Sequence, residues 1–396
     1  MFRLTTPTTK GLFHTIQGTL LLDVIGVVIW LALAQASAMA VTNRHYYIQA
    51  EDVTWDFAPT KQNVVHHGPI PAPYETVWSK VRYIEYTDGT FTTRKPQPVW
   101  LGILGPIIRA EVGDTVFVHF RNRSTKGSFG MHPHGFRYDK DNEGAHYLPG
   151  PGAGAEIPPG GSFTYRWYAD EESSPSPTDP SSLVWWYHSH ISEYQETNLG
   201  LLGPIIITKR GRARPDGSPV DVDREFVTAF VIFNQAEGEE RGQMHSINGY
   251  IFGNLRGLEM NEGENVRWYL LGMGNEVDLH AAHFHGKTVL YKKGRTDTIE
   301  LLPGSMATVD MKADNPGTWM YHCHVADHIK AGMLATYTIK PRALPAITTS
   351  SKRVRGRLRA APRNVLLPNR NVGKSNIDSL TKRKRPRSYP TRSNPT

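Results

Sequence analysis

The two halves of this 396-residue chain repeat each other, and this duplication constrains the fold more than any other feature. EVGDTVFVHF at 111–120 resembles NEGENVRWYL at 261–270, and VWWYHSH at 184–190 resembles TWMYHCH at 318–324. Each copy consists of short β-branched and aromatic runs separated by Gly, Pro, Asp and Asn turns, which is typical of β-sandwiches. The sequence therefore predicts an all-β protein in which one sandwich occurs twice.

The apolar runs also set the expected boundaries. We expect the first domain at 41–209, a polar Gly/Pro-rich linker at 210–224 and the second domain at 225–340. No segment shows the long 3.6-residue periodicity of an amphipathic helix. The expected strands lie at 115–120, 162–168, 184–190, 203–208, 225–233, 264–272, 318–324 and 335–340.

Residues 1–40 are typical of an export signal. Arg3 and Lys10 precede an apolar run at 24–34, and small residues follow at Ala36, Ala38 and Ala40. The alternative is an uncleaved membrane anchor, although the run is short for a span. We therefore expect a secreted or periplasmic protein.

The C-terminal segment 341–396 contains fifteen Lys and Arg against one acid, Asp378. It lacks apolar periodicity, so we expect a disordered basic tail. The tail could touch anionic envelope polymers or lipid headgroups, or be a solvated extension without a partner. Because the basic charge lies in the tail and the rest of the chain is acidic, nucleic-acid binding is not expected.

The chain has one cysteine and 17 histidines. A single cysteine excludes an intramolecular disulfide framework, a cysteine-held iron–sulfur cluster and a Cys-rich zinc module. Eight of the histidines form four H-x-H pairs at matching points of the repeat, and alternate residues of a strand point to the same face. Eight neutral imidazoles exceed what one ion needs and fit a cluster of three coppers. They are His132, His134, His188, His190, His283, His285, His322 and His324.

A second set of candidate ligands occurs only in the second copy. Two imidazoles, a thiolate and a thioether suit a blue-copper electron-transfer site. The second copy has His280, Cys323, His328 and Met333, where the first has Phe129, Ser189, Tyr194 and Leu199. None of the first-copy side chains is a ligand for such a site.

Cys323 lies directly between His322 and His324. In an extended strand its thiolate points one way and the two imidazoles the other, so the two candidate sites are joined through adjacent peptide units. A one-electron site coupled to a three-copper site can supply the four electrons that reduce dioxygen to water.

The four motifs HPHG, WWYHSH, HAAHFHG and HCHVADHIKAGM resemble the copper motifs of multicopper oxidases. Flanking stretches such as YYIQAEDVTWDFAPT and MHSINGYIFGNL are similar to ceruloplasmin and hephaestin, from about Tyr46 to Lys340. The resemblance implies two cupredoxin-like Greek-key sandwiches, a small two-domain oxidase with its type 1 copper in the second domain, and four coppers per protomer.

The resemblance also implies a role for each ligand. His280, Cys323, His328 and axial Met333 would bind type 1 copper, and His132 and His283 type 2 copper. One type 3 copper would take His134, His188 and His324, and the other His190, His285 and His322. Cys323, His322 and His324 would carry the electron path.

The reducing substrate is left open between ferrous or cuprous ion and phenols. Asp327 precedes His328 and matches an acidic residue that helps to hold iron in ceruloplasmin, and Glu237, Glu239 and Glu240 are looser candidates for the same role. His245 could lie near the substrate side of the second domain. In two-domain relatives the cluster forms between neighbouring chains, so we expect a homotrimer with dioxygen as the oxidant.

Two other functions are considered. A copper nitrite reductase carries its blue site in the first domain, which Phe129, Ser189, Tyr194 and Leu199 exclude here. A non-catalytic copper-binding relative would not need a cysteine site joined to four H-x-H pairs. Blue absorbance that bleaches with reductant without air and returns with air would distinguish an oxidase from both.

Overall fold

A computed structural model describes residues 42–71, 75–235, 242–275 and 277–342. The expected signal, most of the basic tail, and Glu237, Glu239 and Glu240 lie outside these residues. Within them, no helix is both long enough and apolar enough to cross a membrane.

Among the described residues, the first half contains ten strands and one short α-helix, α2 (Glu193–Leu199), with 3-10 turns at Val99–Leu101, Lys140–Asn142 and Glu171–Ser173. Its strands are β1 (Asn43–Asp56), β2 (Gln62–Asn63), β3 (Gly68–Pro69), β4 (Val77–Tyr86), β5 (Ile108–Glu111), β6 (Thr115–Asn122), β7 (His132–Pro133), β8 (Ser162–Tyr168), β9 (Ser182–His188) and β10 (Leu202–Thr208).

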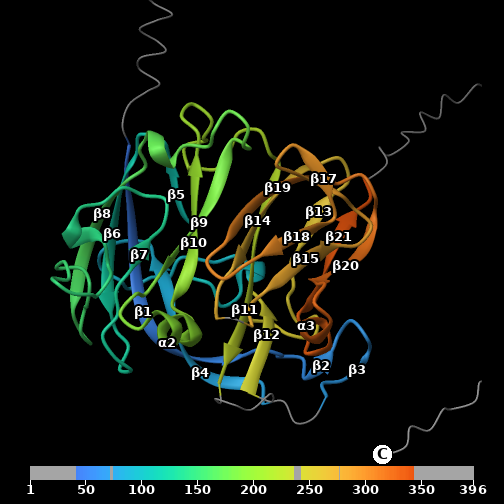
Figure 1. The fold of residues 1–396 in the computed structure, drawn as a ribbon, viewed down its shortest axis with the longest axis horizontal. Helices are drawn as coiled ribbons and strands as arrows, with labels where there is room; N and C mark the ends of the chain where they lie inside the picture. The colour runs from blue at the N-terminus through green and yellow to red at the C-terminus, as the bar shows by residue number, and fades with distance from the viewer. Residues whose placement is uncertain (1–41, 72–74, 236–241, 276, 343–396) are drawn as a thin grey trace, which may run out of the picture. The chain divides into compact units, whose positions relative to one another are not determined.

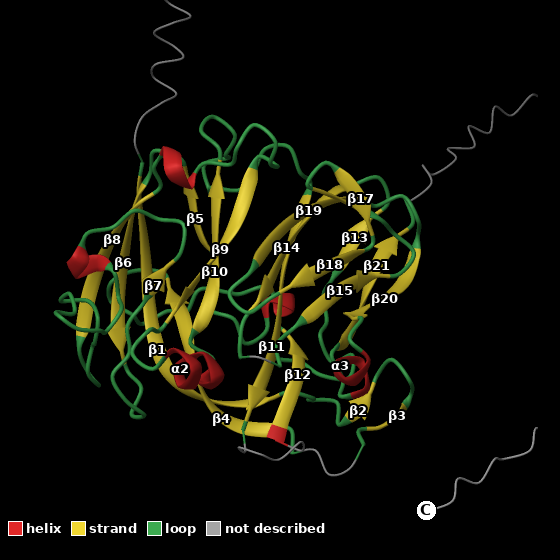
Figure 2. Cartoon of the chain, in the orientation of Figure 1, coloured by secondary structure: helices red, strands yellow, loops and turns green. Residues whose placement is uncertain are grey.

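In the part of the second half that the structure describes, there are eleven strands and the short helix α3 (Ala326–Lys330). Its strands are β11 (Arg224–Asn234), β12 (Gln243–Ile247), β13 (Glu259–Asn261), β14 (Asn265–Gly272), β15 (His280–Phe284), β16 (Val289–Tyr291), β17 (Gly294–Thr296), β18 (Thr298–Leu301), β19 (Met306–Lys312), β20 (Gly317–Cys323) and β21 (Leu334–Lys340). Figure 2 shows how strands dominate the chain, and the all-β prediction is confirmed. A strand occurs at every position where the sequence predicts one.

The same strand order recurs in both halves. The first half has sheets β4-β1-β6-β8 and β5-β10-β9-β7, and the second has β12-β11-β14-β19 and β13-β21-β20-β15, extended by β16-β17 and by β18. In each half two strand pairs are parallel at matching places: β1 with β6 and β5 with β10 in the first half, and β11 with β14 and β13 with β21 in the second. The sequence repeat therefore has a direct structural counterpart.

Three buried apolar clusters hold these sheets together. One lies between the two sheets of the first half and one between the two sheets of the second. The third joins the halves, with Val184, Trp186 and Ile206 of β9 and β10 against Val227 and Leu271 of β11 and β14. Strands that are buried on both faces need continuous apolar runs, which explains the sequences GPIIIT and FVTAFVIF.

The four sheets consequently form successive layers, which can be followed across Figure 1. The sheet of β9 in the first half lies against the sheet of β11 in the second half, and the sheet of β15 and β20 is the layer farthest from the first half. This order decides where the candidate ligands lie relative to one another.

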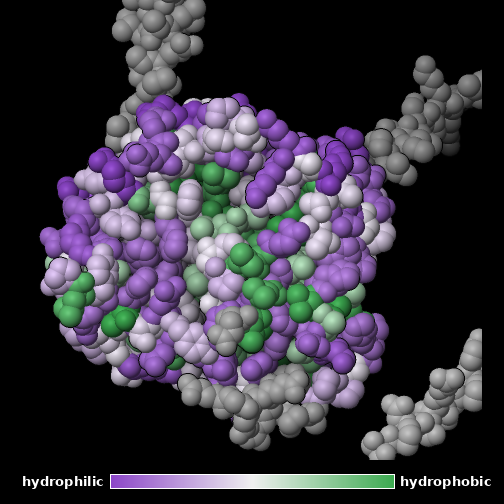
Figure 3. All heavy atoms as spheres, in the orientation of Figure 1, coloured by the Kyte–Doolittle hydropathy of each residue, from purple (hydrophilic) through white to green (hydrophobic). Residues whose placement is uncertain are grey.

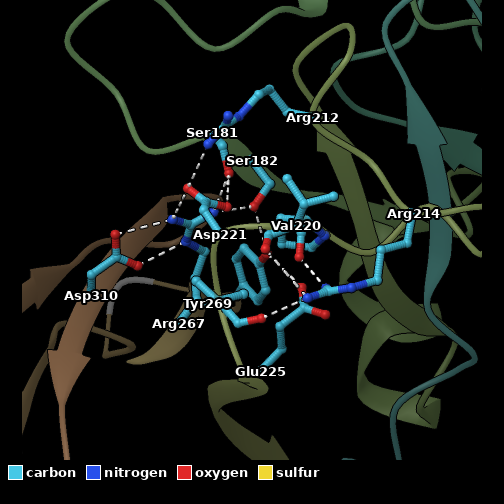
Figure 4. Close-up of polar contacts among 12 residues, drawn as sticks. Ser181, Ser182, Arg212, Arg214, Val220, Asp221, Glu225, Arg267, Tyr269 and Asp310 are labelled. Atoms are coloured by element: carbon cyan, nitrogen blue, oxygen red, sulfur yellow. Dashed lines mark hydrogen bonds and ion pairs between the residues drawn. The ribbon is translucent and has the colours of Figure 1, made fainter. Parts of the chain in front are cut away.

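A buried polar network also crosses the junction, as Figure 4 shows. Arg267 of β14 forms two hydrogen bonds with the Asp310 carboxylate, at 2.7 and 3.0 Å, and donates to the hydroxyls of Ser181 and Ser182. The Tyr269 hydroxyl bonds Ser182 as well, at 2.7 Å. Because each buried polar group has a partner, the network fixes how β9 lies against β14 without leaving an uncompensated charge.

Candidate metal centres

The side chains of His280, Cys323 and His328 meet at one end of the second-half core. The Nδ1 atoms of the two histidines are 3.2 Å apart, and the Cys323 Sγ lies 3.9 Å from Nδ1 of His280 and 3.5 Å from Nδ1 of His328. All three side chains are buried. Burial raises the pKa of the Cys323 thiol and lowers the pKa of His328, so both groups favour their neutral forms without a metal ion.

Asp278 fixes which nitrogen of His280 faces the cysteine. Its buried Oδ1 lies 3.2 Å from His280 Nε2 and also accepts from the backbone N–H of Ile232 at 2.7 Å. The carboxylate therefore holds a proton on Nε2, and the Nδ1 lone pair points toward Cys323. This orientation is the one that a ligand histidine requires, since an outer partner sets the tautomer of the coordinating ring.

Met333 is placed beside this group by the backbone. The Cys323 N–H donates to the Met333 carbonyl at 3.0 Å, and the Met333 N–H donates to the His328 carbonyl at 2.9 Å. The Met333 side chain is buried in the same apolar cluster as Cys323. Two imidazoles, one sulfur and a nearby thioether form a donor set that fits blue copper.

The strand register separates the cysteine from the flanking histidines, as the alternation predicts. On β20, Cys323 lies opposite Ala282 and points into the core, whereas His322 lies opposite His283 on the other face. His283 has ring contacts with His285, His322 and His324, at centroid distances of 4.8, 5.2 and 5.2 Å. The Nε2 atoms of His285 and His322 are 3.0 Å apart.

The first half forms an equivalent group of four. His132 has ring contacts with His134, His188 and His190 at 5.3, 5.5 and 5.1 Å, and the Nε2 atoms of His134 and His188 are 3.1 Å apart. Burial and repulsion from neighbouring histidines lower the pKa of His134 to about 4. Burial lowers the pKa of His188 to about 3. At neutral pH the imidazoles of His134 and His188 are therefore uncharged and can bind a cation.

In each group, two of the four histidines bond a backbone carbonyl through their outer nitrogen, Nδ1. A carbonyl only accepts, so each Nδ1 must carry a proton and each Nε2 offers its lone pair to the centre of its group. The bonds are His132 to Glu143 at 2.8 Å, His188 to Ser189 at 2.9 Å, His283 to Asp297 at 3.1 Å and His322 to Cys323 at 2.8 Å. The residues present therefore fit copper bound through Nε2.

The glycine that follows each H-x-H pair is required by packing. Gly135 and Gly286 both have positive φ, 76° and 70°. A Cβ on Gly135 would lie 2.4 Å from the ring of Trp185, and one on Gly286 2.5 Å from the ring of Trp319. Each tryptophan lies on the strand that carries the next histidine pair, so the contact fixes one pair relative to the other.

The first half retains the backbone of the cysteine site but fills it with other side chains. Ser189 is buried, and its Oγ accepts from the Gly130 N–H at 3.1 Å, just as the Cys323 Sγ accepts from the Ala281 N–H at 3.4 Å. Buried Phe129 occupies the His280 position. The structure thus agrees with two of the four correspondences inferred from the sequence repeat, Ser189 with Cys323 and Phe129 with His280.

The other two matches, Tyr194 and Leu199, are wrong. The Leu201 N–H donates to the Glu196 carbonyl and the Ser189 N–H to the Leu201 carbonyl, reproducing the bonds that Met333 makes with His328 and Cys323. Glu196 and Leu201 are therefore the counterparts of His328 and Met333. The loop between Ser189 and α2 is longer than the loop between Cys323 and α3. Counting equal numbers of residues from Ser189 and from Cys323 therefore pairs the wrong residues.

Replacing Ser189 by Cys should not create a second blue centre. Phe129 would still occupy one ligand position, and the buried Glu196 carboxylate is held by the N–H groups of Ile191 and Ser192 at 2.9 and 3.0 Å. We expect one type 1 copper per chain in Ser189→Cys, measured from the blue absorbance per chain. A doubled absorbance would show that the correspondence between the halves is wrong.

Within the described residues, no hydrogen bond or ring contact joins the two groups of four histidines. The first-half group lies on the sheet of β9, and the second-half group lies on the outer face of the sheet of β15 and β20. Two sheets intervene, and because stacked sheets pack roughly 10 Å apart, the separation is about 20 Å. One chain therefore does not bring all eight histidines together.

Sequence reasoning missed Asp278 and gave little weight to His245. Asp278 lies two residues before His280, just ahead of β15, and this short spacing could have identified it as an orienting partner. His245 is buried, its ring centroid is 5.0 Å from that of His328, and its Nδ1 has no hydrogen-bond partner among the described residues. Asp327 is exposed in the first turn of α3, next to His328.

Comparison with known proteins gives a consistent result. Family models described as multicopper oxidase match residues 83–212 and 227–343. The chain is 36% identical to Ferroxidase HEPHL1 of Homo sapiens over 78% of its length, and 36% identical to human ceruloplasmin over 80%. These matches cover 30% and 33% of the relatives, so the chain spans about a third of their length.

Solved structures show the same fold. A crystal structure of a multicopper oxidase aligns with a TM-score of 0.55 and 23% identity, covering 76% of this chain and 90% of the other. Multicopper Oxidase mgLAC aligns with a TM-score of 0.54 and 21% identity, covering 78% and 90%. At this identity the likeness extends to the fold alone.

Proposed function

The chain belongs to the multicopper oxidase family, and from this premise we propose that it couples one-electron oxidation of a reducing substrate to the reduction of dioxygen to water. The observation that carries the proposal is the arrangement on β20. There a buried thiol faces two histidine Nδ1 atoms, and the two residues beside it belong to a separate histidine group.

Copper in these groups would supply one-electron redox chemistry at the cysteine and multi-electron transfer to dioxygen at the histidines. Cys323, His280, His328 and Met333 would hold type 1 copper, His132 and His283 type 2 copper, and the other six cluster histidines the type 3 pair. This gives four coppers per protomer. Cys323 shares peptide units with His322 and His324, which provides a covalent route between the sites. Asp278 would keep His280 oriented throughout.

The separation of the two histidine groups supports a cluster shared between chains. His324 is exposed and His190 is 36% exposed, so both groups are open at the surface of one chain. Exposed Leu279 directly precedes β15, which carries His283, and exposed Leu302 directly follows β18, the strand paired with it. Figure 3 shows apolar residues gathered over this part of the second half. We propose a homotrimer with one cluster at each interface.

The structure also suggests where the donor approaches. Asp327 is exposed beside His328, while His245 contacts His328 from β12 with an unpartnered ring nitrogen. A carboxylate and an imidazole next to a type 1 ligand could bind a ferrous ion and favour the ferric product, which carboxylate oxygens hold more tightly. Ferroxidase or cuprous oxidase activity and laccase-like oxidation of phenols are both kept as candidates.

Asp327→Ala should discriminate between these donors. If the carboxylate binds a metal substrate, kcat/KM for ferrous ion should fall by about tenfold or more, while turnover of a bulky phenol remains near the wild-type value. Oxygen uptake with each donor measures both rates. Equal activity on both donors would remove Asp327 from the substrate site and leave a generic laccase, without affecting the oxidase proposal.

Export is proposed from residues 1–40, which would place the protein outside the cytosol as a secreted or periplasmic enzyme. The basic tail could then hold it to anionic envelope polymers or lipid.

A further inference from the structure

A carboxylate lies on the inner side of the first-half histidine group. Glu193 begins α2, and its two oxygens are 3.5 Å from Nε2 of His190 and 3.9 Å from Nε2 of His188. Because His188 Nδ1 donates to the Ser189 carbonyl, Nε2 is the nitrogen that remains for a metal ion. The carboxylate therefore lies beside the coordinating atoms and not behind the rings.

The position of Glu193 differs from that of Asp297, a carboxylate near a histidine of the second-half group. Asp297 lies 3.8 Å from Nδ1 of His283, the outer nitrogen, where it can only orient the ring. Glu193 can instead supply an oxygen to the same ion as the imidazoles. Donor atoms about 2.0–2.2 Å from one ion lie within about 4.4 Å of each other, and each Glu193 oxygen satisfies this limit with one imidazole, Oε2 with His190 and Oε1 with His188.

The second half has no such carboxylate at the matching place. Since Glu196 corresponds to His328, Glu193 corresponds to Val325, a partly buried residue that packs against the second-half core. The acidic donor is therefore specific to the first-half group. The Glu193 side chain is 47% exposed and is not locked by packing, so it can move the short distance to a bound ion.

We propose that Glu193 is a copper ligand of the first-half group, which captures a cupric ion in the single chain before subunits join. Cu(II) accepts imidazole nitrogen and carboxylate oxygen together. In one chain the group receives no histidine from the second half, because two sheets intervene. A negatively charged donor supplies the attraction for a dication that four neutral imidazoles lack. The inference rests on the proposed function, in that it takes copper as the ion that these histidines bind.

The test measures Cu(II) affinity in the full-length protein without metal. A His283→Ala/His285→Ala background removes competition from the second-half group and leaves His280, Cys323 and His328 intact. In that background Glu193→Gln is compared with the parent by competition titration against a chelator of known affinity. Glu156→Gln is the matched control, because Glu156 is similarly exposed, at 46%, and contacts His146, which is outside the cluster.

We expect Glu193→Gln to weaken Cu(II) binding by about 10- to 100-fold, and Glu156→Gln to leave it unchanged. Equal affinity in the Glu193→Gln variant and the parent would overturn the proposal, as would an equal loss in the control. The blue absorbance of the cysteine site is recorded in each sample and confirms that each variant is folded. If the parent shows no blue absorbance, that result counts against the proposed oxidase function only. The comparison of Cu(II) affinities still tests the role of Glu193, because it does not depend on the blue absorbance.

Discussion

Cys323→Ser is expected to abolish the blue absorbance and to lower donor-dependent oxygen uptake by at least ~10³-fold, about 4 kcal/mol in activation free energy. A serine hydroxyl does not replace a thiolate as a soft copper ligand. The fold should survive, because Ser189 occupies the matching buried position in the first half and bonds the equivalent backbone N–H. The absorption spectrum, copper per chain and oxygen uptake measure these effects.

The variant should lose one copper per chain while the histidine groups keep theirs. His322 and His324 belong to the other site and lie on the opposite face of β20 from Cys323. Electron paramagnetic resonance of the remaining copper distinguishes the two sites. Oxygen uptake at the wild-type rate without blue absorbance would contradict the assignment of Cys323 as the entry point for electrons.

Two inactive variants should restore activity when they assemble together. His134→Ala disables the first-half group and His285→Ala the second-half group, so each alone should be inactive. A mixed ring of three has exactly one interface that joins an intact first-half group to an intact second-half group, so we expect isolated mixed rings to have about a third of the wild-type activity. Coexpression with two different tags allows the mixed rings to be isolated and assayed.

The control is a mixture of His134→Ala and His188→Ala, in which every first-half group is defective and no interface can be complete. It should remain inactive. Light scattering should show a trimer in each preparation. A fully active four-copper monomer, or no recovery in well-formed mixed trimers, would contradict a cluster shared between chains.

The sequence by itself determined the chemistry of the candidate ligands and the repeated β fold. Strand alternation needs only local backbone geometry, so Cys323 could be predicted to point away from His322 and His324. The spacing of each H-x-H pair likewise predicts two imidazoles on one face, as His132/His134 and His283/His285 show. Such predictions succeed because they depend on residues that are close in the chain.

The tertiary structure decided what local spacing cannot. Asp278 orients His280 only because β11 supplies the Ile232 N–H that holds its carboxylate. Glu196 is identified as the counterpart of His328 because both accept the same backbone hydrogen bond, from Leu201 and from Met333 respectively. The two loops differ in length, so residue spacing alone does not show this. Above all, the apolar surface shared by β9, β10, β11 and β14 stacks the halves so that the two histidine groups lie on different layers. Burial of that surface, which is a property of the whole fold, is what separates ligands that the sequence alone groups together.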